Sequence, residues 1–128
     1  MSKKYKILIA DDESLNYLFY REILIDDIYD IIYVDNGIDA VREIRENPDK
    51  FDLILMDMKM PDMDGFTATA EIRKFNSQIP IIAQTAYAYR EDIDRVKEAG
   101  CNDYISKPIR EEVLISKIEK HLGINNQE

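Results

Sequence analysis

Short apolar runs recur along the chain and alternate with segments whose apolar residues are spaced three and four apart. Uninterrupted runs rich in Ile, Leu and Val favour strands that are buried on both faces, as in a parallel sheet. The sequence predicts five such strands, the last of them a weaker match, at residues 7–10, 31–34, 53–56, 79–83 and 103–105.

A helix is predicted after each of these strands. The core-facing side of the first helix is expected to carry Leu15, Leu18, Phe19 and Ile23, with Asp12 or Ser14 near its start. Gly100 and Gly123 are placed to end the fourth and fifth helices, because glycine adopts the left-handed conformation of a helix C-cap. The apolar positions of the second to fifth helices are, in order, Ile38, Val41 and Ile44; Phe66, Ala70 and 72–75; Ile93, Val96 and Ala99; and Ile109, Val113, Leu114 and Ile118.

The alternation of strands and helices predicts a doubly wound α/β fold. We expect a (βα)5 three-layer sandwich with a parallel five-stranded sheet, of the flavodoxin-like type. A chain of 128 residues suits one buried core, and no repeat, low-complexity tract or linker divides it. Residues 1–128 are therefore predicted to form one domain.

Polar side chains follow four of the predicted strands at their carboxyl ends, where open α/β sheets bind ligands. Asp11 and Asp12 follow the first strand, Asp57 the third, Thr85 the fourth and Lys107 the fifth. Clustered carboxylates repel one another, and a hard cation such as Mg²⁺ relieves that repulsion. A lysine and a hydroxyl beside the metal would bind phosphoryl oxygens. The pattern indicates phosphoryl transfer, with one carboxylate acting as metal ligand or as nucleophile.

Asp11-Asp12, the segment 55–65, Thr85-Ala86 and Lys107-Pro108 together resemble the receiver domain of two-component response regulators, over nearly the whole chain. The resemblance implies a phosphorylation switch with Asp57 as phosphoryl acceptor. It implies that Asp12, Asp57 and the backbone carbonyl of Lys59 bind Mg²⁺, with Mn²⁺ able to substitute, and that Asp11 contributes through a bound water.

The resemblance also assigns roles to three further residues. Lys107 is expected to pair with the phosphoryl group, and Thr85 to donate a hydrogen bond to it. Tyr104, three residues before the lysine, matches the aromatic switch position. Lys59 and Tyr87 are expected to flank the mouth of the site, where we hypothesise that they restrict water and set the lifetime of the acyl phosphate.

The implied partner is a histidine kinase or a histidine phosphotransfer protein that donates its phosphoryl group. Phosphorylation is expected to alter the surface of the fourth helix, fifth strand and fifth helix, and a weak or phosphorylation-dependent dimer is compatible with this. The residues within the motifs are most similar to those in receivers of hybrid histidine kinases. A stand-alone regulator is the alternative. That surface is expected to include Tyr87, Tyr89, Arg90, Arg95, Lys97 and residues 113–121.

Composition narrows the function classes. With 26 acidic against 17 basic residues the net charge is -9, which argues against direct binding to nucleic acid or to anionic membranes. The one cysteine, Cys101, is expected to be a packed thiol, and the absence of disulfides fits a cytoplasmic location. His121 is interpreted as a surface residue rather than a phosphodonor.

Three other functions fit the sequence less well. A phosphohydrolase with an aspartyl nucleophile typically has a second Asp two residues later, where this chain has Lys59. A nucleotide-binding module would need a glycine-rich phosphate loop, and the four glycines are not clustered. A degenerate receiver is disfavoured because each motif position is intact. As an isolated domain the chain is therefore expected not to be an enzyme, beyond its own phosphorylation and dephosphorylation.

Overall fold

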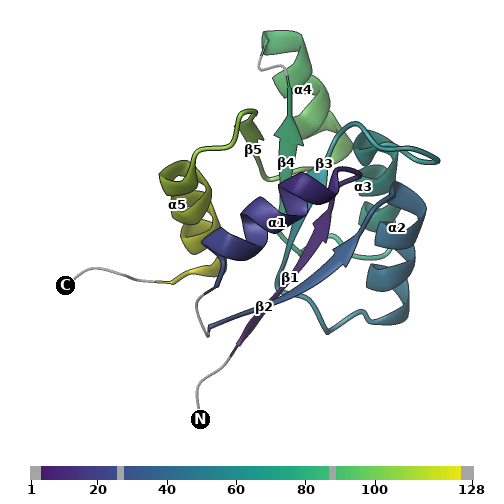
Figure 1. The fold of residues 1–128 in the computed structure, drawn as a ribbon. Helices are drawn as coiled ribbons and strands as arrows, with labels where there is room; N and C mark the ends of the chain where they lie inside the picture. The colour runs from purple at the N-terminus through teal and green to yellow at the C-terminus, as the bar shows by residue number, and fades with distance from the viewer. Residues whose placement is uncertain (1–3, 26–27, 87–88, 125–128) are drawn as a thin grey trace.

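The computed structural model describes residues 4–25, 28–86 and 89–124. Within these residues, five strands alternate with five helices in a three-layer sandwich (Figure 1), and the predicted α/β class is confirmed. The strands are β1 (Tyr5–Ala10), β2 (Tyr29–Val34), β3 (Leu53–Asp57), β4 (Ile81–Thr85) and β5 (Asp103–Ser106). The helices are α1 (Ser14–Ile23), α2 (Gly37–Glu46), α3 (Gly65–Arg73), α4 (Arg90–Ala99) and α5 (Glu111–Leu122).

The sheet is parallel, with the strand order β2-β1-β3-β4-β5. The order reverses between β1 and β3, because the chain builds outward from β1 in one direction and from β3 in the other. Such a reversal leaves a crevice at the carboxyl ends of the two strands. Asp11 and Asp12 follow β1 and Asp57 ends β3, so the topology delivers the acidic residues to this crevice.

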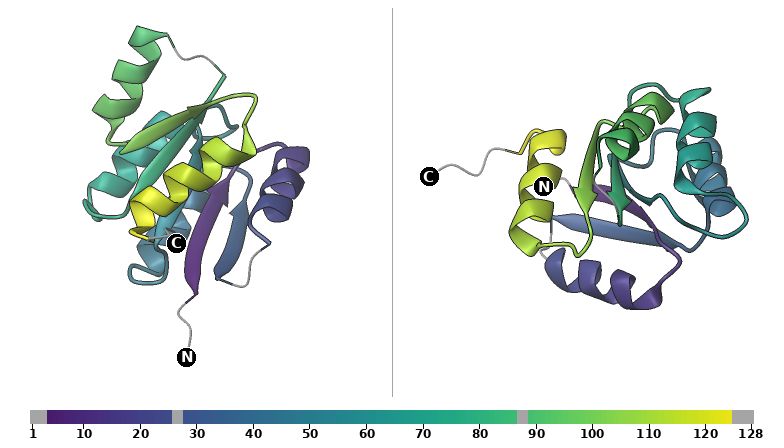
Figure 2. Two further views of the ribbon diagram at one scale, coloured as in Figure 1. Left: turned by 90° about the vertical axis from the view of Figure 1, so that its left-hand side faces the viewer. Right: turned by 90° about the horizontal axis from the view of Figure 1, so that it is seen from above.

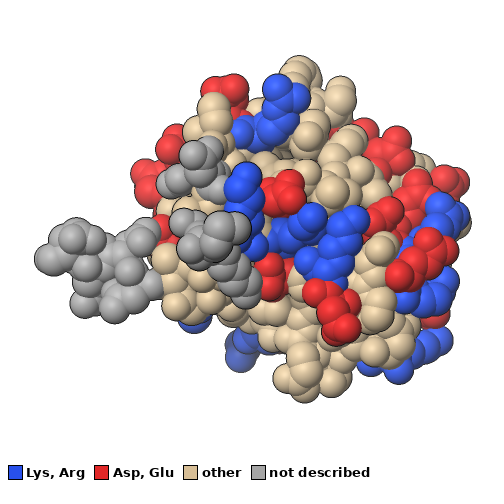
Figure 3. Space-filling view, turned by 90° about the horizontal axis from the view of Figure 1, so that it is seen from below, with Lys and Arg blue, Asp and Glu red and all other residues tan. Residues whose placement is uncertain are grey.

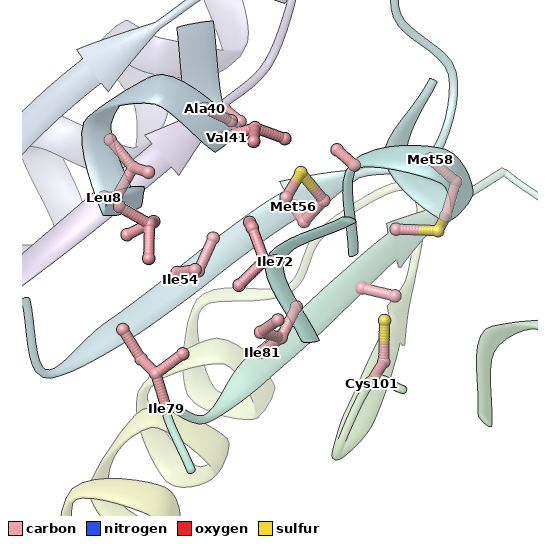
Figure 4. Close-up of a cluster of buried hydrophobic side chains, with 14 of the residues drawn as sticks. Leu8, Ala40, Val41, Ile54, Met56, Met58, Ile72, Ile79, Ile81 and Cys101 are labelled. Atoms are coloured by element: carbon pink, nitrogen blue, oxygen red, sulfur yellow. The ribbon is translucent and has the colours of Figure 1, made fainter. Parts of the chain in front are cut away.

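Each face of the sheet has its own hydrophobic core. Side chains alternate along a strand, so Ile7 and Ile9 face one side and Leu8 and Ala10 the other. Helices α1 and α5 cover the first side, and α2, α3 and α4 cover the second (Figure 2). The second core includes Met56 and Ile72, which pack with the aliphatic side chains drawn in Figure 4.

The predicted core-facing side of α1 is wrong for three of its four residues, whereas Ile23 packs against the core as expected. Leu15, Leu18 and Phe19 are 77%, 48% and 39% exposed, whereas Tyr20 is fully buried in the core under α1 and α5, together with Leu24. The spacing of apolar residues predicted the wrong side because tyrosine was not counted among them, whereas the neighbouring leucines were. A tyrosine ring buries a large apolar area, and here it decides which side of the helix meets the sheet.

The other elements follow the sequence pattern only in part. Gly100 and Gly123 cap α4 and α5 with φ angles of 115° and 72°, as predicted. The strand expected to be buried on both faces, β2, is instead an edge strand whose residues are all partly exposed. Helix α1 begins at Ser14, one of the two residues expected near its start, and its N-cap residue, Glu13, makes no side-chain cap hydrogen bond.

His121 is not the surface residue that was predicted. Its side chain is 16% exposed, and Nε2 lies 2.9 Å from Oδ2 of Asp103 at the start of β5. Lys117 Nζ donates to the other carboxylate oxygen of Asp103 at 2.8 Å and to the carbonyl of Tyr104 at 2.7 Å. These contacts attach α5 to β5. Cys101 is buried, as expected, and burial raises the pKa of its thiol to about 11.

Figure 3 looks at the end of the molecule opposite the crevice, where basic and acidic side chains are intermingled. Lys6 Nζ lies 3.0 Å from Asp30 Oδ2 near the start of the sheet. None of the helices in the described part of the chain combines the length and the apolar character needed to span a bilayer.

Candidate functional site

Three carboxylates meet at the crevice. One ligand oxygen from each of Asp11, Asp12 and Asp57 can be chosen so that all lie within 4.8 Å of one another. Asp11 and Asp57 are buried, whereas Asp12 is exposed. Close carboxylates are costly to hold together without a cation, and oxygen ligands suit Mg²⁺. The donor set and its spacing therefore fit a hard divalent cation.

Asp11 is held on several sides. Its Oδ1 accepts a hydrogen bond of 2.9 Å from the Glu13 amide, and the Asn16 amide lies 3.2 Å from Oδ2. Its backbone carbonyl accepts a 2.6 Å hydrogen bond from the Tyr33 hydroxyl on β2. These bonds orient the loop after β1, so the adjacent acidic pair enters the crevice in a defined geometry.

Asp57 lies at the end of β3, with its side chain 3% exposed. Lys107 Nζ donates to Asp57 Oδ1 at 3.1 Å, and the Lys59 amide donates to the same oxygen at 3.3 Å. Oδ2 receives no hydrogen bond from the described residues. One oxygen of the predicted acceptor is thus anchored, and the other stays available for a metal ion or an electrophile.

The electrostatics of the carboxylates reflect burial and mutual repulsion. Burial, opposed by the Glu13 amide and reinforced by the charge of Asp57, raises the pKa of Asp11 to about 6. Burial also raises the pKa of Asp57, although the Lys107 ammonium acts against it. Both shifts mean that the folded protein opposes negative charge at this crevice, and a bound cation would remove that opposition.

Thr85 and Lys107 are brought together by the backbone. The Lys107 amide donates to the Thr85 carbonyl at 2.8 Å, so the ends of β4 and β5 are tied beside Asp57. Thr85 is 7% exposed and lines the crevice. The peptide between Lys107 and Pro108 is cis.

Tyr104 is partly buried and does not line the acidic crevice. It borders a neighbouring cleft of about 420 Å³ between β5 and α5, together with Lys107 and Lys117. The ammonium of Lys117 lies 4.9 Å from the centroid of its ring. Tyr104 is therefore adjacent to the site through Lys107, which borders both clefts.

Gly65 controls the approach of α3 to Asp57, the predicted acceptor. Its amide donates to the Met58 carbonyl at 3.0 Å. A Cβ added at this position would collide with the carbonyl oxygen of Asp57 and lie 2.8 Å from the Cα of Met58. The close packing of α3 against the end of β3 thus requires glycine, which explains the Asp64-Gly65 pair in the motif.

The crevice is a cleft of about 680 Å³. Lys59 lines it, as predicted, and Tyr87 lies outside the described residues. Arg95 was predicted only as part of the output surface, but it also lines the cleft, where its guanidinium carbon lies 3.9 Å from the centroid of the Phe66 ring. No strand-end pattern marks a residue within a helix, so only the packing of α3 and α4 reveals it. The cleft is also lined by Glu13, Met58, Met60, Asp64, Gln84, Ala86 and Asp92.

Comparison with known proteins gives a consistent result. The family model described as the response regulator receiver domain matches residues 7–119. The polar-differentiation response regulator DivK of Brucella anthropi is 35% identical over 91% of this chain and 95% of its own length. The sensor histidine kinase GacS of Pseudomonas protegens is 35% identical over 96% of this chain, which spans 14% of that kinase.

Solved structures agree. The receiver domain of the sensor histidine kinase PA1611 from Pseudomonas aeruginosa, which has a magnesium ion coordinated in its active-site cleft, superposes with a TM-score of 0.85 at 35% identity, covering 94% of this chain and 98% of that one. A CheY-like receiver domain protein from Methanospirillum hungatei has a TM-score of 0.85 at 30% identity, covering 94% and 95%.

Proposed function

The chain belongs to the response regulator receiver domain family, and we propose that Asp57 is the residue at which its phosphorylation switch operates. The observation that supports this is the position of Asp57, which lines the cleft within the acidic cluster and has one carboxylate oxygen hydrogen-bonded to Lys107. A carboxylate so placed can attack phosphorus without losing its anchor.

The reaction is the transfer of a phosphoryl group to the free oxygen of Asp57. That oxygen forms the new P–O bond as the P–N bond of a donor phosphohistidine breaks, and the imidazole nitrogen keeps the bonding electron pair. Lys107 neutralises charge on the acceptor side, because its ammonium is already 3.1 Å from Asp57. Transfer of this kind depends mainly on positioning and on charge neutralisation.

The residues present fit a magnesium site. Asp12, Asp57 and the Lys59 carbonyl would hold the ion, with Asp11 acting through a bound water. When bound, Mg²⁺ neutralises the charge that builds up on the phosphoryl oxygens. The buried position of Asp11 and its hydrogen bonds to Glu13 and Asn16 suit a residue that orients a water rather than one that binds metal directly.

The switch would operate through Thr85 and Tyr104. A phosphoryl group adds about −1.5 to −2 charge and several acceptor oxygens at Asp57. Thr85 then moves toward it, and the tie between Thr85 and Lys107 carries the displacement to β5. Tyr104 rotates in response, which changes the α4-β5-α5 surface that a partner reads.

The donor we propose is a histidine kinase or a histidine phosphotransfer protein, in the cytoplasm. Relatives of both architectures, a stand-alone regulator and hybrid kinases, match the chain with similar identity. As a domain on its own it would catalyse only its own phosphorylation and dephosphorylation; within a hybrid kinase, the parent chain would be the enzyme.

The test is intact-mass spectrometry after incubation with acetyl phosphate and Mg²⁺. We expect the wild-type chain to gain one phosphoryl group, and the gain to vanish when EDTA is added or when Asp57→Asn removes the nucleophilic carboxylate. Asp52→Asn, at the opposite end of β3, is the matched control and should be phosphorylated normally.

A phosphoryl gain that persists in Asp57→Asn would contradict the assignment of the acceptor. If the wild-type chain gains nothing from acetyl phosphate, the same assay is repeated with a phosphorylated histidine phosphotransfer domain. Absence of transfer from that donor as well would exclude the proposed switch.

A further inference from the structure

Three buried polar atoms lie without a hydrogen-bond partner among the described residues. They are the hydroxyl oxygen of Tyr20 and both side-chain amide atoms of Gln84. Both residues are 0% exposed. A buried polar group without a partner costs about 1–3 kcal/mol, so folded proteins almost always satisfy such groups.

The two side chains lie on the same side of the sheet. Tyr20 belongs to α1 and packs in the core beneath α1 and α5. Along β4, Ala83 faces the opposite core and Ile82 faces this one, so the alternation of the strand turns Gln84 toward α1 and α5 as well. A phenol and an amide that face the same apolar core can satisfy one another through an enclosed water.

Strand alternation turns Asp57 to the same side of the sheet as Gln84, the side on which Leu53 and Leu55 lie. Gln84 is opposite Asp57 in the β3–β4 register, and its carbonyl accepts a 3.1 Å hydrogen bond from the Met58 amide. Burial raises the pKa of Tyr20, and the charges of Asp11 and Asp57 raise it further, which indicates that the phenol lies within electrostatic range of both carboxylates.

We propose that one enclosed water joins Tyr20 and Gln84 in a buried hydrogen-bonded pair, since no direct hydrogen bond links them in the structure, and that this pair positions the phosphorylation site. Gln84 immediately precedes Thr85, and Tyr20 lies on the helix that follows Asp11 and Asp12. The pair therefore joins the two segments that supply the hydroxyl and the acidic residues, and it holds their separation on either side of Asp57.

The role of the pair rests on the proposed function, whereas its existence does not. A fixed separation of the two segments matters at the moment of transfer, because small misplacements of reacting groups slow a positioned reaction strongly. Loss of the pair should therefore reduce the maximal rate of phosphorylation rather than the affinity for the donor.

The experiment uses Tyr20→Phe, Gln84→Leu and the double variant, which keep the buried volume nearly unchanged. Thr69→Val is the matched control, since Thr69 is also 0% exposed but lies on α3 in the opposite core, with its hydroxyl 3.7 Å from Cys101 Sγ. Urea unfolding of the four variants and the wild type gives the unfolding equilibrium constants.

If the pair exists, the double variant unfolds less readily than the product of the two single effects predicts, by about fivefold or more. In NMR spectra, the side-chain amide signal of Gln84 is identified by its loss in Gln84→Leu. This signal shifts in Tyr20→Phe. Additive effects together with an unmoved amide signal would show that the two side chains do not interact, whatever the outcome of phosphorylation.

The positioning role is read from phosphorylation by acetyl phosphate in Mg²⁺. We expect each single variant to lose about three- to tenfold in maximal rate with an unchanged half-saturating donor concentration, and Thr69→Val to match the wild type. If the unfolding effects of the two substitutions are non-additive but the variants are phosphorylated at the wild-type rate, the positioning role is overturned. If the wild-type chain itself accepts no phosphoryl group, the proposed function fails, and the unfolding cycle still decides the pair.

Discussion

The charge balance at Asp57 depends on one lysine that lies 50 residues away in the chain. The Asp57 carboxylate is almost completely buried, and Lys107 supplies the cation within hydrogen-bond distance. Breaking such a pair by removing one partner leaves an uncompensated buried charge. Removing Lys107 is therefore expected to lower the stability of the folded protein.

Lys107→Ala should reduce phosphorylation by acetyl phosphate about 100-fold, because the transferring group loses a positioned cation. The initial rate of phosphoryl incorporation, followed by intact mass, measures this. Lys97→Ala removes an exposed charge from α4 and should leave the rate within twofold of wild type. Equal rates in the two variants would remove Lys107 from the mechanism.

The contacts of Asp103 with Lys117 and His121 make the stability of the fold depend on pH. Burial raises the pKa of Asp103, but the hydrogen bonds from Lys117 and His121 outweigh it, so the pKa lies below its ordinary value. A depressed folded-state pKa contributes stability that is present above the unfolded value of about 3.9 and is lost as pH falls through the folded one.

Asp103→Asn should therefore lower the free energy of unfolding at pH 7 by about 1–3 kcal/mol and make it less sensitive to pH below about 4. Urea unfolding across this range measures both effects. Asp30→Asn is the control, since Asp30 is 45% exposed in its pair with Lys6 and such surface pairs contribute about 0–1 kcal/mol. An unchanged acid limb in Asp103→Asn would contradict the assignment.

At the scale of elements, the loop between β3 and α3 decides how Asp57, the proposed acceptor, is presented. Asp64 accepts a 2.8 Å hydrogen bond from the Thr67 amide and so caps α3, while Gly65 allows the helix to meet Asp57 without a collision. Asp62 has a φ of 67°, a left-handed conformation that non-glycine residues seldom adopt. The loop is thus shaped by several local devices that act together.

Gly65→Ala should destabilise the fold by about 1–3 kcal/mol and also slow phosphorylation, because the added methyl group displaces the end of β3 or the start of α3. Ala70→Gly, at an exposed position in the same helix, should cost about 1 kcal/mol and leave phosphorylation unchanged. Comparing the two by urea unfolding and by phosphorylation rate separates misplacement from simple loss of stability.

At the scale of the whole molecule, a cation bound at the carboxylate cluster would couple folding to cation binding. A ligand that binds the folded state alone stabilises it by mass action, by about 2.7 kcal/mol at 100 times its dissociation constant. Thermal unfolding with increasing Mg²⁺ should show a rising midpoint. In Asp12→Asn the midpoint without metal should be higher, because repulsion is relieved, and the rise with Mg²⁺ smaller.

Asp94→Asn serves as the control for a general charge effect, since Asp94 is exposed on α4 and does not line the cleft. Its response to Mg²⁺ should equal that of the wild type. A midpoint that does not respond to Mg²⁺ in any of these proteins would show that the cluster does not bind the ion.

The strands, the order of the elements and the ends of α4 and α5 could all be predicted from the sequence. These features depend on local composition, namely apolar runs such as residues 53–56 and the glycines at positions 100 and 123. The convergence of Asp11, Asp57 and Lys107 was also predictable, because parallel strands present their carboxyl ends at one edge.

Tertiary structure alone decided the features that depend on contacts between distant segments. It turned Tyr20 rather than Leu15 toward the sheet, paired His121 with Asp103, and stacked Arg95 on Phe66. The burial of a side chain and the electrostatic potential around it depend on neighbouring residues from several elements. The sequence pattern gives the spacing of residues within an element but not the rotation of that element against its neighbours. Packing between elements fixes this rotation, so only the tertiary structure determines it.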